Sequence, residues 1–165
     1  MSTRRWASED GFNLIEIIVA LAVVAAALAI AFPMFNSAPQ NLAADLQDFS
    51  LNLQVAREFA VSRTIHYHVA VAAGGPPYRY AIEHCDTTVT NCTVPSSWVP
   101  ERTIALRPNV SFSSLPTPAS AEFDTRGLLV VQTGQSAPVT FTLQDTARGW
   151  SKQVTVNGSG MVDRP

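Results

Sequence analysis

The chain has 165 residues, enough for one domain and too few to expect two, and 47% of them are apolar while 15% are charged. A formal net charge of −2 excludes a global cationic field that would attract nucleic acid or an acidic surface. The sequence holds no Walker loop, HExxH or CxxC motif, and Gly158–Gly160 lacks the frame of a nucleophile elbow. We therefore expect a protein that is not an enzyme and that binds no cofactor or metal.

The first predicted element is a membrane-spanning helix. Residues 17–32 contain no charged or polar side chain, and the stretch 12–35 gives about 36 Å of helix, enough to cross a hydrocarbon core of roughly 30 Å. A cleaved secretory signal would have a shorter apolar run with its cleavage site after it, whereas Gly11 precedes the run. Arg4 and Arg5 stand before the span and the next basic residue is Arg57. This asymmetry predicts a cytoplasmic N-terminus and an exported domain.

Glu16 is the one charged residue within this span. An ionised carboxylate there costs about 3 kcal/mol, and less if its side chain reaches back to the nearby membrane interface. The simpler interpretation is that the Glu16 side chain reaches the interface in this way. The alternative is that Glu16 meets a cation from another chain. Cleavage after Gly11 would create such a cation, because Phe12 would then carry a protonated α-amino group. A pair of this kind depends strongly on orientation and would set the register between neighbouring helices.

A second helical pattern follows Pro33 and Pro39, which we expect to bend or loosen the chain between its two helical parts. Apolar residues recur there at alternating steps of four and three, with polar side chains on either flank, and this period predicts an amphipathic helix. A stripe of this kind usually faces a core. Its members are Leu42, Leu46, Phe49, Leu53, Ala56 and Ala60.

The period changes to two at Thr64, which predicts strands. Gly and Pro clusters separate the alternating stretches, and the continuous apolar run at 127–131 is a candidate buried strand. The alternating stretches are 64–71, 78–83, 109–114, 139–143 and 152–157. One long helix followed by six or more strands predicts an α+β fold, with an antiparallel β-sheet packed on the second half of the helix.

Two small residue groups lie within the strand-rich part. Cys85 and Cys92 are close in a polar, turn-rich segment, so a disulfide is favoured if the domain is exported, and two free thiols are the alternative. His66 and His68 lie two apart and share one face of a strand. The sequence nominates no third ligand beside them, so we expect histidines that face solvent and not a metal site.

The N-terminal residues resemble a class III signal of the type IV pilin superfamily. Gly11 ends a short charged leader, Phe12 follows it, and Glu16 is the fifth residue of the chain that cleavage would produce. Asn13 stands where threonine is commonest, and Pro33 stands at the place of a helix-bending proline. The resemblance implies cleavage between Gly11 and Phe12 by a prepilin peptidase, N-methylation of Phe12, and pairing of Glu16 with the amino group of a neighbouring subunit.

The downstream half is similar to H-type minor pseudopilins and FimT-type minor pilins. Phe123 and Gly127 match an F-x-x-x-G segment of that group, and Gly160 and Val162 match its glycine and valine after the last strand. The similarity implies a minor pseudopilin, a structural subunit of the periplasmic pseudopilus of a type II protein secretion system. The alternative is a FimT-type minor pilin of a type IV pilus, acting in pilus assembly or DNA uptake.

The C-terminal residues weigh against DNA as a partner. In DNA-binding members of that group the closing glycine begins a G-R-x-R pattern, whereas here Gly160 is followed by Met161 and Asp163 in place of the two arginines. Lys152 is the single lysine of the chain. Because affinity for phosphates comes mainly from Lys and Arg, these replacements weaken the case for DNA binding directly.

These interpretations divide the chain into a cleaved leader at 1–11, a transmembrane and filament-core helix at 12–35, and an exported pilin-like domain at 36–165. We expect a single-pass protein of the bacterial inner membrane, with its N-terminus in the cytoplasm and its C-terminal domain in the periplasm. The expected partners are the prepilin peptidase, other pseudopilin or pilin subunits, the inner membrane and secreted proteins. A single-span receptor with a chance match to the signal is the remaining alternative, and it would not be shortened at Gly11.

Overall fold

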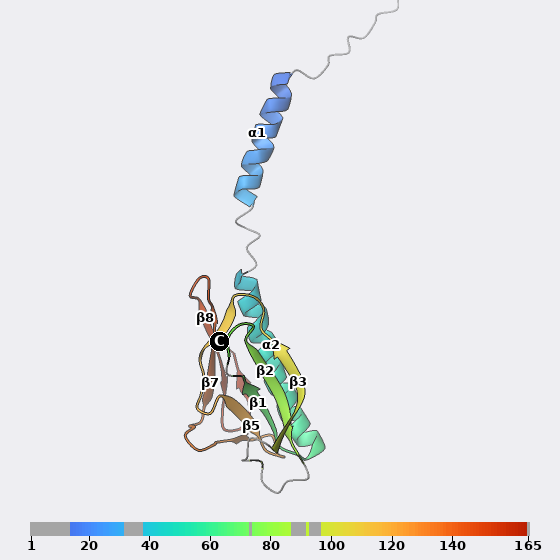
Figure 1. Cartoon of the computed structure of the whole chain (residues 1–165), viewed down its shortest axis with the longest axis vertical. Coiled ribbons are helices and arrows are strands. Elements are labelled where there is room, and N and C mark those ends of the chain that lie inside the picture. Colours follow the sequence, from blue (N-terminus) through green and yellow to red (C-terminus); the bar gives the residue numbers. More distant parts are fainter. Residues whose placement is uncertain (1–13, 32–37, 73, 87–91, 93–96, 165) are drawn as a thin grey trace, which may run out of the picture. The chain divides into compact units, whose positions relative to one another are not determined.

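The computed structural model describes residues 14–31, 38–72, 74–86, 92 and 97–164. The chain divides into two compact units, residues 1–37 and residues 38–165. The first unit contains helix α1 (Leu14–Ala31), and the second contains helix α2 (Ala38–Arg63) followed by nine strands among the described residues (Figure 1). The predicted α+β class with antiparallel pairing is confirmed.

The strands form two antiparallel sheets where the sequence led us to expect one. The larger sheet has the order β3-β2-β1-β5-β6 and the smaller has the order β4-β7-β8-β9. The larger sheet consists of β1 (Tyr67–Val71), β2 (Arg79–Cys85), β3 (Trp98–Ala105), β5 (Ser120–Phe123) and β6 (Leu129–Val130). The smaller consists of β4 (Val110–Ser114), β7 (Val139–Asp145), β8 (Ser151–Val156) and β9 (Val162–Asp163). Alternation of apolar and polar residues predicts strands but does not indicate which strands share hydrogen bonds. The division into two sheets could therefore not be predicted from the sequence.

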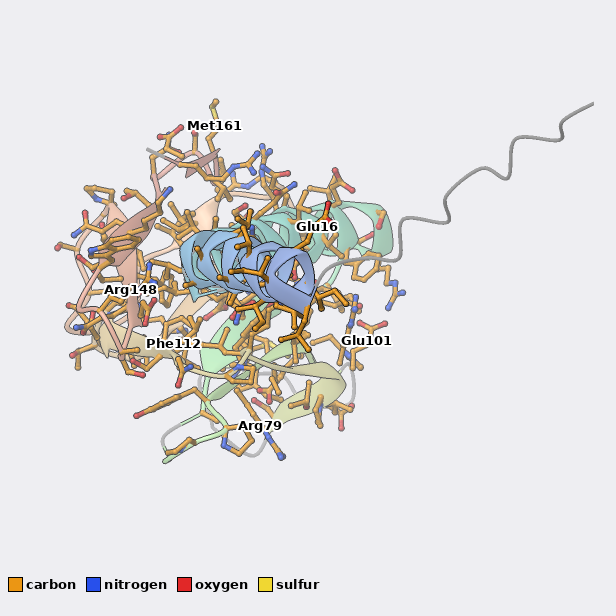
Figure 2. All side chains as sticks on the ribbon, turned by 90° about the horizontal axis from the view of Figure 1, so that it is seen from above. Glu16, Arg79, Glu101, Phe112, Arg148 and Met161 are labelled. Carbon is orange, nitrogen blue, oxygen red and sulfur yellow. A yellow bond between two sulfur atoms is a disulfide. The ribbon has the colours of Figure 1, made fainter. Side chains whose placement is uncertain are left out.

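Helix α1 carries one carboxylate on an otherwise apolar rod. Alanine and leucine favour the helix, and Glu16 stands in its first turn, where a negative charge interacts favourably with the helix dipole. The side chains described from Leu14 to Ala29 are all exposed, and that of Glu16 projects outward from the helix (Figure 2).

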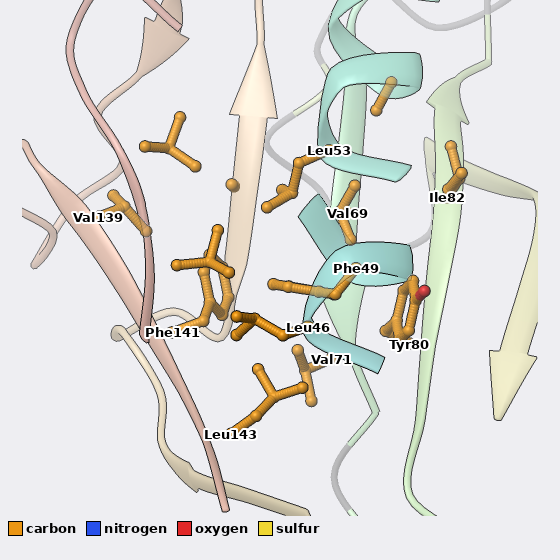
Figure 3. Packing of buried hydrophobic residues seen from close by; sticks show 14 of the residues in the cluster. Leu46, Phe49, Leu53, Val69, Val71, Tyr80, Ile82, Val139, Phe141 and Leu143 are labelled. Atoms are coloured by element: carbon orange, nitrogen blue, oxygen red, sulfur yellow. The ribbon is translucent and has the colours of Figure 1, made fainter. Parts of the chain in front are cut away.

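Helix α2 supplies the centre of the core. Pro39 is its second residue, a position where the missing N–H of proline costs little. All six members of the apolar stripe from Leu42 to Ala60 are buried, as the sequence predicted. Figure 3 shows three members of this stripe, Leu46, Phe49 and Leu53, packed among residues of β1, β2 and β7. Phe49 is fully buried and meets Tyr80 and Phe141 edge to face, with ring centroids 4.9 and 5.1 Å apart.

Three strands carry no signal that we read from the sequence. β3 is an edge strand that contains Pro100 and is mostly exposed, which is the situation in which a sheet tolerates proline. β5 has four residues, all buried, and one of them is Glu122. β9 has only two residues. These segments form strands because neighbouring strands offer free hydrogen-bonding edges, and not because of their own pattern.

Candidate functional site

Two five-residue turns repeat one hydrogen-bonding pattern. In the first, the Asp124 carboxylate accepts hydrogen bonds from the backbone N–H groups of Arg126 and Leu128, and Gly127 N donates to Asp124 O. In the second, Asn157 Oδ1 accepts from the N–H groups of Ser159 and Met161, and Gly160 N donates to Asn157 O. Asp and Asn initiate such turns by accepting from the backbone ahead of them. Each turn then needs a left-handed residue, and glycine supplies it with φ values of +75° and +74°.

The two turns meet on helix α2. Arg57 Nε donates a hydrogen bond of 3.0 Å to Gly127 O. A Cβ atom added at Gly160 would overlap that same carbonyl oxygen and lie 3.1 Å from Arg57 Nε. A Cβ atom added at Gly127 would lie 2.9 Å from Cγ2 of Val61. The structure thus brings together the two glycines singled out in the sequence and explains both by close approach, with Arg57 as the third member.

A second contact anchors the beginning of α2. Arg107, in the connection between β3 and β4, pairs with Asp45 and also with Asp48, the latter at 3.0 Å, and its backbone N–H donates to Asp45 Oδ2 at 2.8 Å. Asp45 is buried, and that burial raises the pKa of its carboxyl above the ordinary value while Arg107 opposes the shift. Asp45 and Asp48 are two of the polar residues that flank the apolar stripe in the sequence, and no local pattern indicates that they share Arg107 as a partner.

The expectation of solvent-facing histidines is wrong. His68 is 7% exposed, its Nε2 lies 2.7 Å from Glu83 Oε2, and its ring stacks on Trp98 with centroids 3.7 Å apart. His66 is half-buried, with Nδ1 2.8 Å from Glu122 Oε1. Strand pairing explains the difference, because β1 places His68 directly opposite Glu83 of β2 and Glu122 of β5.

Burial also acts on the pKa of His68. It lowers the pKa of His68, and the pairing with Glu83 only partly opposes that effect. His68 Nδ1 is buried without a hydrogen-bond partner among the residues that the structure describes. Within the same residues, no group of three or more His, Cys, Asp or Glu side chains is arranged to hold a metal ion.

The cysteines lie at the end of β2. Cys85 and Cys92 are bonded in the structure, with their Cα atoms 5.6 Å apart. Cys85 is buried. The bond therefore joins Cys92 to the last residue of β2.

A protein-family model described as "Type II transport protein GspH" matches residues 45–160, which is more than half of the chain. The chain belongs to the GspH family. This family consists of structural pilin-like subunits and not of enzymes, and its members assemble with other pilin subunits. The resemblance to H-type minor pseudopilins in the type IV pilin superfamily is thereby confirmed.

Solved structures of two pilin-like proteins share the fold. The type IV minor pilin FimU of Pseudomonas aeruginosa is 16% identical, with a TM-score of 0.58, and the match covers 78% of this chain and 91% of that one. The minor pseudopilin EpsH of the type 2 secretion system of Vibrio cholerae is 12% identical, with a TM-score of 0.56 and coverage of 76% and 96%. Comparison of the sequence with curated proteins gives no significant match.

Most of the residues to which the sequence assigned a role near the N-terminus lie outside the described residues. Gly11, Phe12 and Pro33 lie outside the described residues, so the roles assigned to them stay predictions. Glu16 is described and exposed on α1, and its pairing with another subunit also stays a prediction. Among the helices of the described residues, none combines the length and the hydropathy needed to cross a membrane.

Proposed function

We propose that this GspH-family chain is a minor pseudopilin of a type II secretion system, processed between Gly11 and Phe12 and built into a periplasmic filament through its N-terminal helix. The family match over residues 45–160 carries the proposal, since its description is that of type II transport. The likenesses to EpsH and FimU support a pilin-like fold equally well for a secretion system and for a pilus.

The role of Glu16 follows from chemistry. It is the one acidic side chain described in α1, where the surrounding residues are apolar and exposed. In an assembled bundle of such helices, a carboxylate without a cation would pay a large desolvation cost. The protonated, methylated amino group of Phe12 on a neighbouring subunit would offset that cost and fix the axial register of the two helices.

Mass spectrometry of the membrane-extracted protein tests the processing step. We expect a mature chain that begins at N-methylated Phe12. A functional chain that keeps its leader and carries no methyl group would refute the proposal and favour a single-span protein of another kind.

Two substitutions test the role of Glu16. Glu16→Ala should permit cleavage and membrane insertion but reduce co-purification with the other filament subunits at least about tenfold. The reason is that the amino group of Phe12 on the neighbouring subunit would then be unpaired in a low-dielectric setting. Glu58→Ala is the matched control. Glu58 is an exposed acid on α2, and replacing it should leave co-purification unchanged. Normal incorporation of Glu16→Ala would count against the pairing mechanism.

A further inference from the structure

Strand β8 has one edge that is only partly covered. On one side it pairs with β7 along its whole length, from Ser151↔Gln144 to Val156↔Val139. On the other side β9 reaches only Thr155 and Val156. No strand among the described residues lies on that side of residues 151–154, and Ser151, Lys152 and Gln153 are exposed.

The register shows which backbone groups face the open side. Asp145 N donates to Trp150 O at 2.8 Å, so the pair next to it, Gln144↔Ser151, is not hydrogen-bonded. Because bonded and non-bonded pairs alternate in an antiparallel ladder, Lys152 and Val154 direct their N–H and C=O groups toward β7. Ser151 and Gln153 direct theirs outward. The edge therefore offers two donors and two acceptors in the spacing of a strand.

A shallow groove runs along this open edge and is positively charged. It is lined by Ser151, Lys152, Gln153, Thr155, Asp163 and Arg164. Among the residues that the structure describes, neither Lys152 nor Arg164 forms an ion pair within 4 Å, and Asp163 is the one acid of the groove. Arg148, in the turn that leads into β8, does not line the groove and lies over the ring of Trp150, with its Cζ 5.1 Å from the ring centroid.

The charges argue against a second copy of this chain as the occupant. Pairing two such edges would bring Lys152 and Arg164 of both copies together, and like charges on adjacent strands are destabilising. A lysine on an exposed edge is also a common means of keeping identical edges apart. The same cations would attract a strand with acidic side chains.

We propose that the open edge of β8, residues 151–154, binds an extended segment of a different pilin-like subunit, with acidic side chains beside Lys152 and Arg164. Backbone hydrogen bonds to Ser151 and Gln153 would supply affinity, and the two cations would select the partner, as in other cases of strand addition. The inference rests on the proposed function, because the partner is a subunit of the same filament.

Residue-resolved hydrogen exchange on the full-length chain tests the proposal, first in detergent by itself and then in filaments with the other subunits. In the isolated chain, the amides of Lys152 and Val154 should be protected and those of Ser151 and Gln153 should exchange rapidly. In filaments, the exchange of Ser151 and Gln153 should slow at least about tenfold. Filaments that contain the chain but leave both amides rapid would overturn the inference and leave the proposed function intact. Failure of the chain to enter filaments would overturn both.

A pair of variants at one position supplies the second measurement. Gln153→Pro removes the outward N–H without removing a bond to β7, and an edge strand tolerates such a proline. It should reduce recovery in filaments about tenfold, whereas Gln153→Ala keeps the N–H and should change recovery less than about twofold. Equal recovery of the two variants would overturn the inference. Protection of Ser151 and Gln153 in the isolated chain at high concentration would identify a second copy as the occupant and would also overturn it.

Discussion

Alanine at Gly160 would test the contact between the two turns and α2. Gly160 has φ +74°, where an L side chain costs roughly 1–2 kcal/mol. The added Cβ would also overlap the carbonyl oxygen of Gly127, and backbone atoms yield less readily than the end of a flexible side chain. Overpacking of this kind typically costs about 1–3 kcal/mol. The two effects together predict a loss of roughly 2–5 kcal/mol in the free energy of unfolding.

The assay is urea unfolding of the full-length chain in a mild detergent, followed by tryptophan fluorescence and circular dichroism. A loss of this size should lower the urea midpoint by about 1–2 M and the melting temperature by roughly 8–20 °C. Coincident transitions by the two probes would justify treating the unfolding of the second unit as two-state.

Two other glycines separate the strain from the overlap. Gly149 has φ +72°, but the atom nearest to a Cβ added there is Gln144 Nε2, at 4.0 Å. Gly149→Ala should therefore show the backbone strain alone, a loss of about 1–2 kcal/mol in the free energy of unfolding. Gly158 lies in the same turn as Gly160, has no positive φ and has no atom within 4 Å of an added Cβ. Gly158→Ala should therefore be neutral or slightly stabilising. If Gly160→Ala cost no more than Gly149→Ala, the close approach of the two turns would be refuted.

The remaining predictions concern pH, the cysteines and DNA. Because the folded-state pKa of His68 is lowered below its ordinary value of 6.5, the stability due to neutral His68 is complete above pH 6.5 and is lost as pH falls through the lowered pKa. Urea unfolding between pH 7.5 and 5.5 should show this loss, and a His68→Gln variant with an unchanged pH dependence would contradict it. Cys85→Ser or Cys92→Ser should each lower stability by about 2–3 kcal/mol, as expected for a bond with a sequence separation of 7, and a nonreducing mass measurement on periplasmic protein that found two free thiols would refute the premise. A gel shift at low salt with the fragment that begins at Ala38, which keeps buried Leu42, should show no tight binding of duplex DNA, whereas tight and salt-sensitive binding would favour the FimT-type alternative.

The predictions that the structure confirmed depend on local periodicity. The stripe on α2 and the alternating strands could be recognised because a residue and its near neighbours decide which face of a helix or strand is apolar. The predictions that were wrong or incomplete involve pairing between distant segments. His68 lies in an alternating stretch, and that pattern predicted an exposed side chain. Two glutamates from adjacent strands and the ring of Trp98 cover it instead.

The sequence by itself determined the helix with its single carboxylate, the amphipathic helix after it and the strand-rich remainder. Each of these is set by residue type and by spacing along the chain. Only the tertiary structure decided that there are two sheets, that Asp45 shares Arg107 with Asp48, that Gly160 must lack a side chain because of Gly127, and that β8 keeps an open edge. These features depend on which distant backbone atoms approach one another, and no pattern within a single segment encodes that distance.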